Sequence, residues 1–146
     1  MFLGRVRIPT LSDATNEFDV RVGFTEFLAV PLDEACWVYD RNVSTDWQVS
    51  VKNNGTQTIN TVTGFTVDTS GAGSVVTLGV FVNGDGTRVE FFYSADEGVT
   101  WTVFGTATTT NIPTTRNTSM GVSILKSAGT TARTMRVIFA GQTGWL

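Results

Sequence analysis

The strongest local cluster of side chains able to bind a ligand lies between residues 39 and 47. It combines two aromatic rings, two carboxylates and a guanidinium group, from Tyr39, Asp40, Arg41, Asp46 and Trp47. An aromatic ring can stack on the face of a sugar, while carboxylate and guanidinium groups can bind its hydroxyls. These five residues are the predicted glycan-binding site. In the alternative interpretation, which we favour, the two rings pack in the core and the two carboxylates bracket a turn.

A second motif runs from Ser94 to Trp101 and matches the pattern S-x-D-x-G-x-T-W of the Asp boxes found in sialidases. In this pattern Asp96 accepts hydrogen bonds from turn amides, Gly98 takes the special backbone angle and the Trp packs underneath. Sialidases repeat the motif once per propeller blade, away from the catalytic centre. This chain has one copy and is too short for a propeller of several four-stranded blades. The motif therefore predicts a structural hairpin and no sialidase activity.

Other residue types offer little for catalysis or metal binding. The chain has no histidine, which removes Ser-His-Asp and Cys-His arrangements and His-based metal sites. The adjacent Asp33 and Glu34 would point to opposite faces of a strand, whereas glycoside hydrolysis needs two acids facing one bond. Asp85 alone cannot supply the six or seven oxygens of a calcium site. Cys36, in an apolar run, is predicted to be a small buried hydrophobe. We therefore expect no enzyme activity, no cofactor and no metal.

Composition limits the class of protein and its partners. The chain has 146 residues, of which 41% are hydrophobic and only 16% charged, with a net charge of −3. Its basic residues are scattered, so no nucleic-acid partner is expected. No stretch approaches the roughly 18 apolar residues of a membrane helix, and the start lacks the apolar run of a signal peptide, so no membrane insertion is expected. The abundant Thr, Asn and Gly suit strands and turns.

The elements that must position these residues are short strands. Residues 17–24 alternate, with Phe18, Val20, Val22 and Phe24 on one face. Similar runs recur between turn signals, of which Asn83-Gly84-Asp85-Gly86 is the strongest hairpin signal. We expect ten to twelve strands in a single all-β domain spanning residues 1–146. The segment from Phe24 to Asp33 is the least strand-like and could hold a turn of helix.

The order of these segments resembles concanavalin A-like jelly-roll domains of bacteriophage virion proteins. The residues that carry the resemblance are 4–13, 19–24, 37–40, 46–48, 82–91, 110–113 and 125–134. It extends from residue 4 to about residue 140. The resemblance implies an antiparallel two-sheet jelly-roll sandwich of the concanavalin A-like type. Glucanases with a similar fold carry Glu-x-Asp-x-x-Glu on one strand, and this string is absent from the chain.

The resemblance also implies a setting in the virion, as a homotrimer whose partners are other virion proteins. We therefore expect a non-enzymatic structural or assembly domain, of the decoration or tail-accessory kind. The alternative is a receptor-binding module of a tail fibre or tailspike, with a host surface glycan as its ligand. Likeness of fold does not choose between these roles.

Overall fold

The computed structural model describes residues 1–26, 30–67, 75–108, 111–114 and 117–142, with the backbone alone described for 59–63, 106–108 and 142. Ten strands are found in this part of the chain, within the expected ten to twelve. They are β1 (Phe2–Arg7), β2 (Phe18–Thr25), β3 (Glu34–Asp40), β4 (Asp46–Asn53), β5 (Thr56–Thr66), β6 (Val76–Val82), β7 (Arg88–Ser94), β8 (Thr102–Thr108), β9 (Ser119–Lys126) and β10 (Arg136–Gln142).

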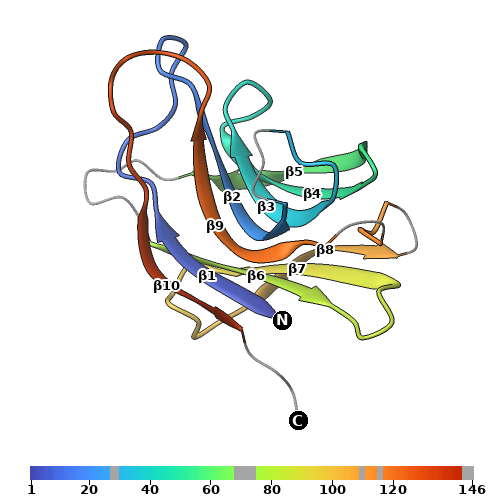
Figure 1. Ribbon diagram of the computed structural model, residues 1–146. Coiled ribbons are helices and arrows are strands. Elements are labelled where there is room, and N and C mark those ends of the chain that lie inside the picture. The colour runs from blue at the N-terminus through green and yellow to red at the C-terminus, as the bar shows by residue number, and fades with distance from the viewer. Residues whose placement is uncertain (27–29, 68–74, 109–110, 115–116, 143–146) are drawn as a thin grey trace.

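The strands form two antiparallel sheets stacked face to face (Figure 1). One sheet has the order β10-β1-β6-β7-β8 and the other β5-β4-β3-β2-β9. The chain passes between the sheets after β1, β5, β8 and β9, as expected for a jelly-roll sandwich rather than for two simple meanders. The prediction of an all-β, antiparallel two-sheet sandwich is confirmed.

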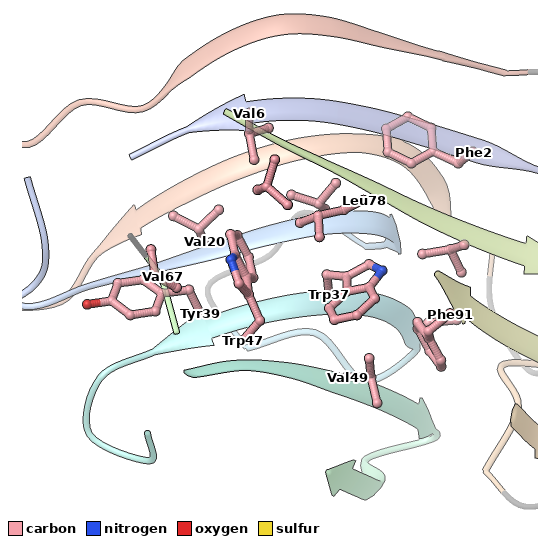
Figure 2. Close-up of a cluster of buried hydrophobic side chains, with 14 of the residues drawn as sticks. Phe2, Val6, Val20, Trp37, Tyr39, Trp47, Val49, Val67, Leu78 and Phe91 are labelled. Carbon is pink, nitrogen blue, oxygen red and sulfur yellow. The ribbon is translucent and has the colours of Figure 1, made fainter. Parts of the chain in front are cut away.

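Alternation along the strands explains how the core forms. In β2, Phe18, Val20 and Val22 are buried against the other sheet, because successive side chains point to opposite faces. Trp37 of β3 lies at the centre of the core and packs edge-on against Phe91 at a ring-centroid distance of 6.0 Å (Figure 2). Its indole N–H donates to the carbonyl of Gly79 in β6 at 3.0 Å. This bond ties the two sheets together.

Two local expectations are tested by the same structure. Cys36 is fully buried, as predicted for a small hydrophobe. The stretch from Phe24 to Asp33 continues as β2 to Thr25, and its other described residues contain no helix, while residues 27–29 lie outside the described part. Among the described residues, no helix is long and apolar enough to cross a membrane.

Candidate functional site

The outer face of the β5-β4-β3-β2-β9 sheet carries a concentration of polar side chains, which we call the polar face. Alternation places them opposite the core positions, and strand register brings them together, since Asp19 pairs with Asp40 and Glu34 with Lys52. The residues of the polar face are Asp19, Arg21, Thr25, Glu34, Cys36, Asp40, Gln48, Ser50 and Lys52.

Glu34 is the centre of a buried network on the polar face. Its side chain is 1% exposed, and its carboxylate accepts a hydrogen bond from Ser50 at 2.5 Å and one from Gln57 at 3.2 Å. Arg21 Nε lies 3.3 Å from Glu34 Oε2, and Lys52 Nζ lies 3.8 Å from Glu34 Oε1. Two cations and two hydrogen-bond donors compensate the cost of burying this carboxylate.

The thiol of Cys36 lies beside the same network. Its sulfur is 3.7 Å from Glu34 Oε2. Burial, and then the negative charge of Glu34, raise the pKa of Cys36 well above its ordinary value. The thiol therefore stays protonated at neutral pH and donates weakly to the carboxylate rather than acting as a nucleophile.

The segment before β3 encloses one end of the polar face. Lys52 Nζ donates to the carbonyl of Pro31 at 3.0 Å, and Gly55 N donates to the carbonyl of Leu32 at 2.8 Å. Asp33 accepts a further bond from Asn54 N at 2.7 Å. These contacts hold the segment against the β4–β5 hairpin, so this end of the polar face is part of the protein interior.

The other end of the polar face reaches solvent. Asp19 and Asp40 are directly paired on β2 and β3, and Arg21 Nη1 lies 3.6 Å from Asp19 Oδ2. Partial burial, and then the charge of Asp40, raise the pKa of Asp19. Gln48 Nε2 donates to the backbone carbonyl of Asp40 at 3.0 Å, while its Oε1 has no partner among the described residues. This end has the carboxylates and the guanidinium group that could bind hydroxyls.

The structure separates the five residues of the predicted glycan site. Tyr39 and Trp47 are 0% and 2% exposed, and their ring centroids lie 6.3 Å apart within the core (Figure 2). Because they point inward from their strands, they offer no ring face to a sugar. The aromatic part of the predicted site is therefore absent from the surface, and only the polar members are left to contact a ligand.

The polar members of that site form a turn. Asp40 Oδ1 accepts from Asn42 N at 2.9 Å, and the exposed Arg41 follows Asp40 in the chain. Asp46 at the start of β4 accepts from Gly64 N at 3.0 Å and from the Thr66 hydroxyl at 2.6 Å. The two carboxylates thus bracket the β3–β4 turn, which is the arrangement of the alternative interpretation.

The Asp-box motif forms the predicted hairpin. Asp96 accepts from the Thr100 amide at 2.8 Å and from the Thr100 hydroxyl at 2.6 Å, and Ser94 Oγ accepts from Gly98 N at 2.7 Å. Hydrogen bonds from Thr100 and Ser94 lower the pKa of Asp96 to about 2. Gly98 has a φ of 95°, as the motif requires. Trp101 packs edge-on against Phe92 and stays 43% exposed, so it is only partly covered.

The predicted hairpin at residues 83–86 also forms. Asn83 Oδ1 accepts from Arg88 N at 2.7 Å, and Asp85 accepts from the hydroxyl of Thr87 at 2.7 Å. Asp85 is thus used within its own turn. Within the described ranges, no group of three or more Asp, Glu, Cys or His residues is placed to hold a metal ion.

Sequence reasoning missed a surface on the outer face of the other sheet, which we call the apolar band. Its residues, from strands β1, β7, β8 and β10 and from the turn before β8, are Leu3, Phe92, Trp101, Val103 and Phe139. Gly79 of β6 lies between Leu3 and Phe92, which would be 3.0 and 2.4 Å from a Cβ at that position. The signal was the run Phe91-Phe92-Tyr93, which is apolar at consecutive positions and so on both faces of its strand.

One comparison with known proteins identifies a family. The family model described as "SO2946-like, C-terminal domain" matches residues 2–137, nearly the whole chain. Neither the curated proteins nor the solved structures contain a significant match. The matched region covers strands β1 to β9 and the first two residues of β10. The chain belongs to the SO2946-like C-terminal domain family.

Proposed function

We propose that the chain is a non-enzymatic structural or assembly domain of a virion, of the decoration or tail-accessory kind. The observation that carries this proposal is the apolar band, in which Val103, Phe139 and Trp101 are 63%, 49% and 43% exposed. Contiguous exposed apolar side chains on a folded domain are typical of interaction surfaces. The virion setting, with other virion proteins as partners and a homotrimer as the assembly, comes from the resemblance in segment order.

The polar face supports a role without catalysis. The carboxylate of Glu34 is buried and bound by Arg21 and Ser50, so a substrate could not contact it in the folded domain. Asp40 is engaged by the amide of Asn42 in its turn. Both carboxylates are thus already bound by groups of the protein itself.

Immunogold electron microscopy of purified virions tests the proposal. Antibodies against the folded domain should label intact particles from the culture that produces the chain, at a constant position on each particle. The chain should also copurify with the particles through a density gradient. Particles that carry neither label nor chain, from a culture in which the chain is abundant, would contradict a virion role.

A second candidate function is recognition of a host surface glycan by a tail fibre or tailspike module. The observation that favours it is the open end of the polar face, where Asp19, Arg21 and Asp40 lie together. A sugar hydroxyl can donate to either carboxylate and accept from the guanidinium group.

A glycan array tests this second candidate with a matched pair of variants. Asp19→Asn should lose binding to host polysaccharides that the wild-type domain retains, because the amide keeps the shape but removes the charged acceptor. Asp85→Asn, in the exposed hairpin of the other sheet, is the control and should bind like wild type. An array without any bound glycan would exclude this function.

A further inference from the structure

We infer that the apolar band docks on the surface of an anionic lipid membrane, and that the arginine side chains beside it bind the lipid headgroups. The domain would lie on the membrane by one face of a sheet and would not span it. The inference rests on the proposed function in taking the band as a contact surface, and it names what the band contacts.

Strand register places the apolar side chains of the band in one row across the sheet. Gly79 pairs with Leu3 on one side and with Phe92 on the other, and Phe92 pairs with Val103. At the far edge, Gly141 pairs with Leu3. Because cross-strand partners point to the same face, the row runs from edge strand β8 to edge strand β10. None of its five side chains can form a hydrogen bond.

The band also has low relief. A Cβ on Gly79 would lie 2.4 Å from the ring of Phe92, and a Cβ on Gly141 would lie 2.7 Å from the ring of Phe139. Both rings therefore lie close over glycine backbone instead of standing away from the sheet. A flat apolar surface can enter the boundary between headgroups and acyl chains, and Trp101 at its edge suits that boundary. The hydroxyls of a sugar would instead lose water there without finding a partner in the row.

Two arginines are paired directly on the same outer face. Arg7 of β1 is the cross-strand partner of Arg136 of β10, and both side chains point away from the core because Val6 points into it. Like charges at directly opposed positions lower the stability of a sheet. An anion that binds both guanidinium groups removes that cost, and the phosphate of a lipid headgroup is such an anion.

The net charge of this face is opposite in sign to that of the chain. Four arginines and two glutamates among the described residues lie on it or beside it, namely Arg5, Arg7, Arg88, Arg136, Glu90 and Glu97. Their net charge is +2, whereas the whole chain has −3. Each arginine near an anionic membrane raises the affinity by about fivefold. A charge this small does little for nucleic acid, whose affinity comes from many phosphate contacts, but a membrane also gains from the apolar row.

Cosedimentation of the whole chain with lipid vesicles tests the inference. Vesicles made of equal parts of phosphatidylglycerol and phosphatidylcholine should bind the wild-type domain, and vesicles of phosphatidylcholine alone should bind it more weakly. Added salt should weaken binding to the mixed vesicles, because it screens the arginines. Mixed vesicles with brominated acyl chains should quench the fluorescence of Trp101, because docking brings its ring to the edge of the acyl region.

Two matched pairs of variants locate the contact on the domain. Val103→Asp places a carboxylate in the row and should weaken binding to the mixed vesicles by about tenfold or more. Val43→Asp makes the same change of net charge in the exposed β3–β4 turn, off the band, and should bind like wild type. Arg136→Gln should weaken binding by about fivefold. Arg41→Gln removes an exposed arginine of the β3–β4 turn and should also bind like wild type.

Thermal unfolding checks that all four variants are folded, as the exposure of the four positions predicts. A wild-type domain that does not sediment with the mixed vesicles at low salt would overturn the inference, and so would equal losses within either pair. Binding to polygalacturonate or to single-stranded DNA, without binding to vesicles, would also overturn it and assign the band to that polymer.

The virion role fails separately, because it is tested by the presence of the chain in purified particles. A domain that labels particles but does not bind vesicles would retain that role and lose this contact. A domain that binds vesicles but is absent from particles would show the reverse.

Discussion

The two sheets of the sandwich present opposite surfaces on the sides that face away from the core. On one sheet, the charged side chain of Glu34 is 1% exposed and bound by five neighbouring side chains within its own fold. On the other, the apolar side chain of Val103 is 63% exposed. From residue type alone, the side chain of Glu34 would be expected at the surface and that of Val103 in the core. The difference shows that the end of the polar face around Glu34 is enclosed by the chain itself, whereas the apolar band lacks a covering layer within the described residues.

The largest loss of stability is expected from removing the negative charge of Glu34 on the polar face. Glu34→Gln leaves the charges of Arg21 and Lys52 without their carboxylate and should lower the free energy of unfolding by about 3–5 kcal/mol. Glu90→Gln is the control, because Glu90 pairs with a half-exposed Arg88 and its loss should cost less than about 1 kcal/mol. Urea denaturation measures both. Equal costs would mean that the polar face is an ordinary solvated surface.

The second largest loss of stability is expected from removing the hydrogen bond between Trp37 and Gly79, which joins the two sheets. Trp37→Phe removes the indole donor to the carbonyl of Gly79, which lies in the floor of the apolar band. An unpaired buried carbonyl costs about 1–3 kcal/mol, to which lost packing adds. Trp101→Phe, at the exposed end of the band, should change the unfolding free energy by less than about 1 kcal/mol. Similar losses in the two variants would show that exposure at the band has been misassigned.

The contribution of the Asp-box hairpin to the stability of the fold should depend on pH. The pKa of Asp96 in the folded protein is about 2, below its ordinary 3.8, so the carboxylate stabilises the fold above pH 4. That contribution is lost as the pH falls from 3.8 to 2. Asp96→Asn should therefore lower the thermal midpoint at pH 7 and have little effect at pH 2. A difference between the two proteins that stays constant with pH would contradict the assigned hydrogen bonds.

The smallest expected effect on stability is that of Asp19 on the polar face, and its dependence on pH is opposite to that of Asp96. The pKa of Asp19 is raised, so its charged form is disfavoured in the fold, and stability is lost as the pH rises through that folded pKa. Asp19→Asn removes this loss and should slightly raise the thermal midpoint at pH 7 but not at pH 3. Asp85→Asn should lower it, because hydrogen bonds from Thr87 hold the pKa of Asp85 below its usual value. At pH 7, the thermal midpoint should therefore rise in Asp19→Asn and fall in Asp85→Asn.

Local signals predicted much of this fold and little of its surfaces. Alternation in residues 17–24 predicted strand β2, and the Asp box predicted the bonds of its hairpin, because both depend on neighbours in the chain. Strand β3 is buried on both faces, so its sequence shows no alternation, and the sequence left both a surface position and the favoured core position open for Tyr39. The Glu34 network and the apolar band each join residues from distant strands. Only the order and register of the strands bring them together.

The most direct test of the contrast between the two faces is the accessibility of Trp101. The Trp145→Phe variant removes the one tryptophan that lies outside the described residues and keeps Trp37, Trp47 and Trp101. Because Trp37 and Trp47 are buried, acrylamide quenching of this variant reports on Trp101. Acrylamide should quench the fluorescence of this variant, and a further Trp101→Phe substitution should remove most of that quenching, because the two tryptophans that are left are buried. Quenching that stays the same after the Trp101→Phe substitution would contradict the account.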